Sequence, residues 1–328
     1  MKEPTKKHIG LFETRPGFGG GNRYQKMVIS ALSQKFNVKD FHVSLKIFPK
    51  AWRPRMLVKI MYLNRTESSI DLWIRNFLGI VGMKFLRRKT RNIALFFHLD
   101  HEKLSHRWLT RIWVREFWKN IRKCEKVVVI SKYWEAFMRG RGVENTKIIY
   151  HGHNINKFVF TETEIDEFKE RYGLTGKPII YLGNCQENKG AREAYESLKD
   201  LPYHLVTSGK KEVDIPALHL ELPYREYLRL LKSAAVVLTM SKFLEGWNIT
   251  AHEAMLCQTP VIGSGAGGMR ELLEGGQQIL CDDFTKLPVL VDYAIRNSDR
   301  LGRDGYSFAK EFSYERFQKD WIELINNL

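Results

Sequence analysis

Glu245 and Glu253 are two carboxylates separated by seven residues, in a segment where an apolar run gives way to a helix start. Asn248 has the residue type of a helix N-cap, which predicts Glu245 in the loop after a strand and Glu253 on the second helical turn. Such a loop lies at the carboxyl edge of a parallel sheet, where open α/β folds bind ligands. Carboxylates there accept hydrogen bonds from hydroxyl groups, and the main-chain N–H groups of Gly246, Trp247 and Asn248 suit a phosphate or sugar oxygen. The structural alternative is a solvated Glu245 and a Glu253 that only stabilises its helix.

A second candidate binding element is the glycine run Gly19, Gly20 and Gly21, between a strand-like stretch at 9–13 and a helix-like stretch at 23–32. Backbone without side chains lets N–H groups approach phosphate oxygens at the positive end of a helix. The run matches neither the dinucleotide-binding nor the P-loop spacing. It therefore predicts an anion site, with a tight structural turn as the alternative.

The elements that must position these residues alternate between short β-branched or aromatic runs and longer amphipathic runs. This rhythm predicts parallel sheets covered by helices on both faces. We expect strands at 9–13, 41–45, 92–98, 127–131 and 147–150, and again at 179–183, 204–208, 217–220, 236–241, 260–264 and 277–281. Since 328 residues exceed the ~250–300 that one core serves, we expect two similar α/β domains. A charged helix expected over 161–177 places their boundary near residue 158.

Charge is distributed unevenly along the chain. Lys and Arg outnumber Asp and Glu by 32 to 11 over residues 1–150, whereas the ratio is 21 to 26 over residues 151–328. A basic half of this kind favours a polyanionic partner, such as a nucleic acid, an anionic membrane or a phosphorylated substrate. The four cysteines form no CxxC pair, and no apolar run reaches the ~18 residues of a spanning helix. A reducing, cytoplasmic setting without a structural zinc is therefore expected.

Two segments of the basic half could bind a surface. A helix expected over 104–123 carries cations at every fourth position, namely Arg107, Arg111, Arg115 and Lys119. A second helix is expected over 70–88, with aromatic residues at helical spacing and a basic end at Lys84, Arg87, Arg88 and Lys89. Aromatic and basic residues on one amphipathic segment suit an interfacial helix on anionic lipid. A solvated helix face and core packing remain the respective alternatives.

The second half also carries a family resemblance. Residues 241–255 (SKFLEGWNITAHEAM) and 259–271 (TPVIGSGAGGMRE) resemble the E-x7-E donor-site signature of the group-one retaining glycosyltransferases. Residues 181–190 resemble the glycine-arginine-to-lysine-glycine segment of that family; Lys189 fits the lysine, and Asn184 replaces the usual arginine. Gly19 to Gly21 fit its glycine loop, and His98 fits its strand-ending histidine. Residues 312–321 resemble its terminal helix.

The resemblance implies an α/β GT-B fold, in which two Rossmann-like domains have parallel sheets facing a central cleft. It implies an acceptor-side domain at 1–157, a nucleotide-sugar domain at 158–305 and a helix at 306–328 that returns to the first domain. Sugar transfer would retain the anomeric configuration. Glu245 would contact the donor sugar, Glu253 the ribose, Lys189 and Asn184 the diphosphate, and His98 the region of the reacting carbon.

The resemblance implies no metal or cofactor, since the nucleotide sugar is the substrate. A His-Asp-His cluster at His98, Asp100 and His101 lacks a third strong ligand, so a metal site is not expected there. We expect an anionic, lipid-linked or glycan acceptor and, because of the basic half, peripheral attachment to the inner membrane face. The alternatives are a nucleic-acid-binding protein, which we do not expect because no binding motif is present, and an inactive GT-B scaffold, which Asn184 leaves open.

Overall fold

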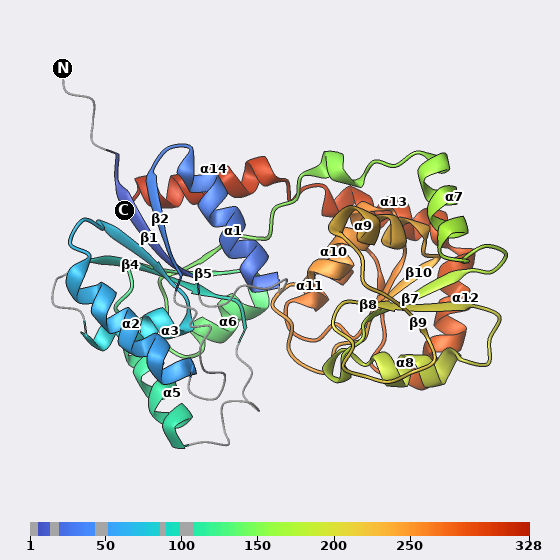
Figure 1. Ribbon diagram of the computed structural model, residues 1–328, viewed down its shortest axis with the longest axis horizontal. Coiled ribbons are helices and arrows are strands. Elements are labelled where there is room, and N and C mark those ends of the chain that lie inside the picture. Colours follow the sequence, from blue (N-terminus) through green and yellow to red (C-terminus); the bar gives the residue numbers. More distant parts are fainter. Residues whose placement is uncertain (1–5, 14–19, 43–51, 86–89, 99–107) are drawn as a thin grey trace. The chain divides into compact units, whose positions relative to one another are not determined.

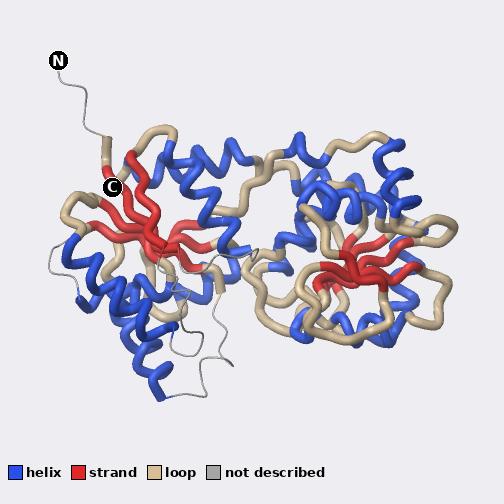
Figure 2. The backbone as a smooth tube through the Cα atoms, in the orientation of Figure 1, coloured by secondary structure: helices blue, strands red, loops and turns tan. Residues whose placement is uncertain are grey.

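The computed structural model of the chain describes residues 6–13, 20–42, 52–85, 90–98 and 108–328. Contacts divide it into two compact units, residues 1–152 with 315–328 and residues 153–314. The sequence places these boundaries at 157/158 and 305/306. Each unit contains one sheet with helices on both faces, and Figures 1 and 2 show the two sheets.

The first unit contains a six-stranded parallel sheet with the strand order β2-β1-β3-β4-β5-β6. Its strands are β1 (His8–Glu13), β2 (Asn37–His42), β3 (Leu72–Arg75), β4 (Arg91–Phe96), β5 (Lys126–Val129) and β6 (Thr146–Ile148). Four of them, β1, β4, β5 and β6, lie where the sequence predicts strands. β2 begins at Asn37 and ends at His42, earlier than the predicted 41–45.

Helices cover both faces of this sheet (Figure 1). They are α1 (Gly20–Ser33), α2 (Trp52–Thr66), α3 (Phe77–Val81), α5 (Trp108–Ile121), α6 (Lys132–Arg139) and α14 (Tyr314–Asn326), with a 3-10 helix at Gly82–Phe85. On one face, α2, α3, α5 and α6 share an apolar core with the strands. On the other, the Tyr24 ring of α1 lies 5.2 Å from Phe317 of α14, and its hydroxyl donates to the Ile149 carbonyl at 2.8 Å.

The helix predicted over residues 70–88 is present only in part, as α3 and the 3-10 helix Gly82–Phe85 that follows it. Its first part is wrong: Leu72–Arg75 forms β3, which pairs in parallel with β1 and β4. All four residues are buried, and three successive ones, Leu72, Trp73 and Ile74, are apolar, so the run also fits helical spacing. Trp73 is 1% exposed and packs in the core, which excludes the interfacial role considered for this segment. Arg87, Arg88 and Lys89 lie outside the described residues.

The second unit contains another six-stranded parallel sheet, with the order β12-β11-β10-β7-β8-β9. Its strands are β7 (Ile179–Asn184), β8 (His204–Ser208), β9 (Leu218–Leu220), β10 (Val236–Thr239), β11 (Val261–Gly263) and β12 (Ile279–Leu280). All six were predicted from the sequence, with small differences at the ends, and they are confirmed. Their apolar runs are short, rich in β-branched residues and bounded by glycine or polar residues, which favours buried strands.

The helices of this unit also lie on both faces of the sheet. They are α7 (Glu162–Arg171), α8 (Ala191–Leu198), α9 (Tyr224–Ser233), α10 (Ile249–Leu256), α11 (Met269–Gly275), α12 (Leu287–Arg296) and α13 (Ser298–Ala309). Three 3-10 turns accompany them, η3 (Ile155–Phe158), η4 (Glu187–Lys189) and η5 (Phe284–Lys286). α8 and α12 share a core with one sheet face, and α9 and α10 pack against each other on the opposite face.

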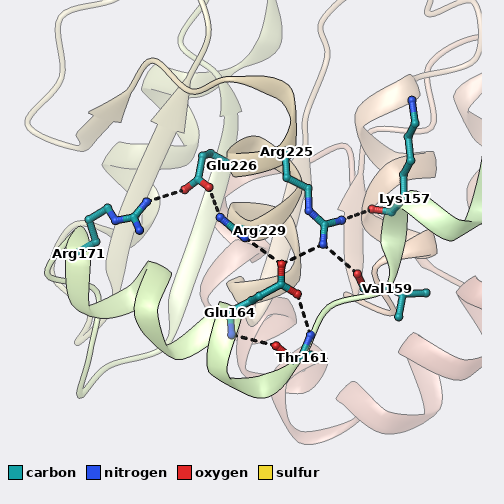
Figure 3. A network of polar contacts seen from close by, with 8 residues as sticks. All are labelled: Lys157, Val159, Thr161, Glu164, Arg171, Arg225, Glu226 and Arg229. Atoms are coloured by element: carbon teal, nitrogen blue, oxygen red, sulfur yellow. Dashed lines mark hydrogen bonds and ion pairs between the residues drawn. The ribbon is translucent and has the colours of Figure 1, made fainter.

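A polar network fastens α7 to α9 (Figure 3). Thr161 and Glu164 form a capping box at the start of α7, in which each side chain accepts from the other residue's backbone N–H. The Glu164 carboxylate also accepts from Arg225 at 3.1 Å and from Arg229 at 2.8 Å. These hydrogen bonds, led by the one from Arg229, lower the pKa of Glu164 to about 2. The helix predicted over 161–177 is present but ends earlier, at Arg171. The ion pairs of Glu164 with Arg225 and Arg229 hold it to α9.

Candidate functional site

Glu245 lies in the loop between β10 and α10, as predicted, and its side chain is buried. Its Oε1 atom accepts from Lys189 Nζ at 2.5 Å and from Ser241 Oγ at 2.5 Å. Asn248 Nδ2 is a third donor, at 3.3 Å. Donors from three directions hold the carboxylate in one orientation.

Lys189 reaches Glu245 from the turn after β7. It is the last residue of η4, and its Nζ atom also lies 4.7 Å from the ring centroid of Phe243. The Lys242 N–H donates to the Asn188 carbonyl at 2.9 Å, which ties this turn to the Glu245 loop. The lysine side chain keeps 23% of its surface exposed, so its cation remains accessible to a ligand.

A glycine-rich loop after β11 passes close to the Glu245 backbone. Glu245 N donates to the Ala266 carbonyl at 3.1 Å, and Gly268 N donates to the Glu245 carbonyl at 2.9 Å. Gly267 has φ +68°, and a Cβ atom at this position would lie 2.5 Å from the Glu245 carbonyl oxygen. Only glycine fits this approach, because a side chain would meet both a left-handed backbone and a clash.

Asn248 joins this loop to α10. Its Oδ1 atom accepts from the Ala251 N–H at 2.9 Å, which confirms the predicted N-cap. Its φ of +71° is tolerated because asparagine adopts left-handed backbone more readily than most residues. Within the described part of the chain, no group accepts from the backbone N–H of Gly246 or Asn248.

Trp247, by contrast, turns its side chain into the core of the second unit. It is 2% exposed, its Nε1–H donates to His252 Nδ1 at 3.0 Å, and its ring lies 5.2 Å from Phe312. His252 Nε2 lies 3.0 Å from the Ala309 carbonyl. Since Nδ1 accepts from Trp247, Nε2 carries the proton and donates to Ala309. The indole thus anchors the loop, and any ligand contact by Trp247 would come from its backbone.

Glu253 lies on α10 as predicted and is 1% exposed. Its Oε1 atom accepts from the Tyr224 hydroxyl at 2.7 Å. Tyr224 is the first residue of α9 and is 38% exposed, so this pair extends from the interior of the unit to its surface. Two carboxylates with different partners therefore belong to one strand-loop-helix segment.

Asn184 is the last residue of β7, on the edge of the sheet where the Lys189 turn begins. Its Oδ1 atom accepts from the Tyr181 hydroxyl at 3.4 Å. Gly209 lies in the neighbouring loop, and a Cβ atom built at its position would lie 3.0 Å from Asn184 Oδ1. The asparagine thus contributes a neutral amide at this edge, and Lys189 provides the cation.

In the first unit, the glycine run and His98 both follow strands that end at the same sheet edge. Gly20 and Gly21 begin α1, and a Cβ built on Gly21 would lie 3.3 Å from the Phe97 ring. His98 directly follows Phe97 and is exposed. These residues are therefore close to one another within this unit. Gly19, Asp100 and His101 lie outside the described residues.

The predicted basic helix is present as α5. Arg111, Arg115 and Lys119 are exposed, whereas Phe117 and Ile121 on the opposite side are buried in the core. Ile112, beside Arg111, is 47% exposed. Arg107 lies outside the described residues. Among the helices that the structure describes, none has the length and apolar character needed to cross a bilayer.

Ser241 and Tyr224 are functional candidates that sequence reasoning missed. Ser241 has a local signal, because it follows β10 and lies four residues before Glu245. Tyr224 has none, because 29 residues separate it from Glu253 and the packing of α9 on α10 brings them together. The carboxylates of Glu245 and Glu253 can accept hydrogen bonds from hydroxyl groups of a ligand. The Lys189 cation and the backbone N–H groups of Gly246 and Asn248 can bind an anion.

Parts of this chain are similar to known proteins. Residues 162–299 match the profile of the family described as glycosyl transferases group 1. An uncharacterized glycosyltransferase of Methanocaldococcus jannaschii is 26% identical over 211 residues, which cover 58% of this chain and 56% of that protein. N-acetyl-alpha-D-glucosaminyl L-malate synthase of Bacillus anthracis is 24% identical over 187 residues, covering 51% and 49%. The matches thus span about half the length of these relatives.

A solved structure resembles the whole chain. The crystal structure of HepE from Anabaena in complex with UDP-glucose aligns with a TM-score of 0.78 at 16% identity, covering 98% of this chain and 100% of HepE. At this identity the likeness shows the fold alone. The fold is GT-B, built from two α/β units with parallel six-stranded sheets.

Proposed function

We propose that this chain, whose residues 162–299 match the group 1 glycosyl transferases, transfers a sugar from a nucleotide-sugar donor to an acceptor hydroxyl. The observation that carries the proposal is the contact of Lys189 with Glu245, beside the N–H groups of Gly246 and Asn248. It combines a cation for phosphate with a carboxylate for sugar hydroxyls. HepE, with UDP-glucose bound, supports a nucleotide-sugar donor.

The donor would bind along the carboxyl edge of the second sheet. Lys189 and the unpaired N–H groups would hold the diphosphate, while Glu245 and Glu253 would accept hydrogen bonds from the donor sugar and the ribose. Asn184 would add a neutral contact to the diphosphate, and His98 of the first unit would contact the reacting region. The nucleotide sugar is the substrate, and we propose that no metal or separate cofactor takes part.

Catalysis would consist of stabilising the leaving diphosphate and placing the acceptor hydroxyl. The charge that develops on the diphosphate is best stabilised by donors already in position, which Lys189 and the backbone N–H groups are. No described side chain is placed as a covalent nucleophile by its contacts. We therefore propose that the acceptor attacks from the face the leaving group departs from, with retention of configuration.

The acceptor would be anionic, lipid-linked or part of a glycan. The basic first half favours such a molecule, and the name of the B. anthracis relative contains L-malate, a dicarboxylic acid. The exposed cations of α5 would bind this acceptor or the anionic membrane surface that carries it. Peripheral attachment to the inner membrane face belongs to the same proposal.

A panel of nucleotide sugars tests the proposal, beginning with UDP-glucose. A ligand that binds only the folded state raises the melting temperature, and a donor should also be hydrolysed slowly without acceptor. Binding without hydrolysis or transfer would indicate an inactive scaffold. Salt-sensitive oligonucleotide binding, without any nucleotide-sugar binding, would contradict the proposal and indicate a nucleic-acid-binding protein.

A further inference from the structure

We propose that the first unit has a second anion site, a cavity that binds a phosphate group at the amino-terminal edge of its sheet. The cavity has a volume of about 1200 Å³. It is lined by the starts of β1, β3 and β4 and by the end of α2, with Leu328 at its border. Lys7 Nζ donates to the Ile325 carbonyl at 3.0 Å, which holds the chain's last residues beside β1 (Figure 1).

The charge of the lining is positive. Lys6, Arg65 and Arg91 line the cavity and have no ion-pair partner among the residues that the structure describes. Of the two acidic side chains in the lining, Glu67 pairs with Lys39 at 2.9 Å, whereas Asp71 accepts from the neutral His8 N–H at 2.8 Å and keeps its charge. The lining thus keeps an excess of positive side-chain charge, because Lys6, Lys7, Arg65 and Arg91 outnumber Asp71.

A buried arginine borders the same cavity. Arg75 is 0% exposed, and its Nε and Nη1 atoms donate to the neutral amides of Asn92 at 2.6 Å and Asn64 at 3.0 Å. Its guanidinium carbon lies 4.9 Å from the Trp73 ring. Asn64 and Trp73 both line the cavity, so the guanidinium lies directly behind its wall.

The Arg75 charge is not neutralised inside the protein. No carboxylate among the described residues pairs with it, and its Nη2 atom is buried without a hydrogen-bond partner. A buried, unpaired cation is costly unless an anion compensates it. An anion in the cavity would supply that compensation.

Thr90 adds a neutral group to this site. It lines the cavity, and its Oγ1 atom is buried with no partner among the described residues. A hydroxyl donor beside several cations matches an anion that offers several acceptor oxygens, as a phosphate group does. Phosphate is therefore the ligand chemistry that fits best.

This site is separate from the proposed acceptor side of the unit. Arg91 is the first residue of β4, whereas His98 follows its last residue, Phe96. A six-residue strand spans about 17 Å, so one small ligand cannot contact both ends. The cavity thus goes beyond the proposed sugar transfer and would bind its own phosphate-bearing ligand.

The test measures binding of inorganic phosphate and pyrophosphate to the full chain by calorimetry and thermal shift, at constant ionic strength. We expect saturable binding that is about tenfold weaker for each of Arg65→Gln and Arg91→Gln, as the loss of one charge-assisted hydrogen bond predicts. Thr90→Val should weaken binding without any change of net charge. The matched control is the pair Arg139→Gln and Arg141→Gln, two exposed arginines of the same unit that do not line the cavity, and it should leave phosphate affinity unchanged.

A second arm compares vesicles that contain phosphatidic acid with vesicles of equal charge that contain phosphatidylserine. If the parent protein prefers phosphatidic acid but does not bind soluble phosphate, and the Arg65→Gln and Arg91→Gln variants lose this preference, the site is supported and its ligand is a lipid headgroup. The absence of binding in both arms would overturn the proposal. Equal losses in the Arg139→Gln and Arg141→Gln controls would also overturn it, because general attraction to a basic domain would then account for the binding.

Discussion

Lys189 Nζ and Glu245 Oε1 lie 2.5 Å apart, although 56 residues separate them in the sequence. The contact joins the turn after β7 to the loop after β10. These two strands are neighbours in the second sheet. It places a cation and a carboxylate side by side at the carboxyl edge. A ligand that carries both phosphate and hydroxyl groups can use both.

Lys189→Ala should weaken nucleoside diphosphate binding by ~1.5–3 kcal/mol, which corresponds to the loss of one charge-assisted hydrogen bond, and should affect the nucleoside less. Calorimetry with both ligands measures the difference. Lys199→Ala is the control, since Lys199 pairs with Glu196 on the surface of the same unit. If the parent protein binds the diphosphate no better than the nucleoside, Lys189 has another role. Asn184→Arg should tighten diphosphate binding.

The two glutamates should separate binding from transfer. Glu245→Gln should lose most sugar transfer with little change in diphosphate affinity, whereas Glu253→Gln should weaken the binding of the nucleoside itself. Tyr224→Phe should change nucleoside affinity through Glu253, because it removes the 2.7 Å hydrogen bond to that carboxylate. Transfer rates and Kd values measured together test the division. Equal, small effects of both glutamate variants would mean that they only stabilise the fold.

His252 should make the second unit less stable in mild acid. Burial lowers its pKa to about 4 from its ordinary 6.5, so the unfolded chain binds a proton in this range that the folded chain does not. The free energy of unfolding therefore has its full value above pH 6.5. It falls as the pH decreases toward 4, by about 2 kcal/mol between pH 7 and pH 5. Urea unfolding at the two pH values measures the loss. His252→Gln should flatten the dependence, whereas His204→Gln, at the start of β8, should leave it unchanged.

Glu164 should show its effect at lower pH. Its pKa is lowered to about 2, so its stabilising effect is present above its ordinary pKa of 4.5 and is lost as the pH falls toward 2. Glu164→Gln should therefore lower the melting temperature at pH 7, and the difference from the parent protein should shrink below pH 4.5. Circular dichroism melts across this pH range measure the difference in melting temperature. Glu196→Gln, which removes a surface pair with Lys199, should show no such convergence.

Charge reversal on α5 tests the proposed membrane surface. Arg111→Glu with Arg115→Glu should abolish a preference for anionic over neutral vesicles, because each basic residue near such a surface contributes about 1 kcal/mol. Donor hydrolysis should persist, since Lys189, Glu245 and Glu253 belong to the other unit. In the parent protein, co-sedimentation should weaken as salt rises. Salt-independent binding, or no binding to either vesicle, would leave α5 as an acceptor surface instead.

Most strands, the Asn248 cap and the placement of Glu253 on a helix could be predicted because they depend on residues close in sequence. Hydrophobic periodicity and N-caps act within one or two turns of backbone, so a single segment contains the information. The same locality explains the failure at β3. Leu72 to Ile74 are buried, and an apolar run of this length fits helix and strand alike.

Local sequence patterns were enough to predict that Glu245 and Glu253 lie at the edge of a parallel sheet, and that the cations of α5 repeat along one helical face. Tertiary packing alone brings Lys189 to Glu245 and Tyr224 to Glu253, and turns the Trp247 indole into the core. It also placed Arg75 behind a basic cavity without an anionic partner among the described residues. These contacts join residues far apart in sequence, so they depend on strand order and helix packing, which local backbone preferences do not encode.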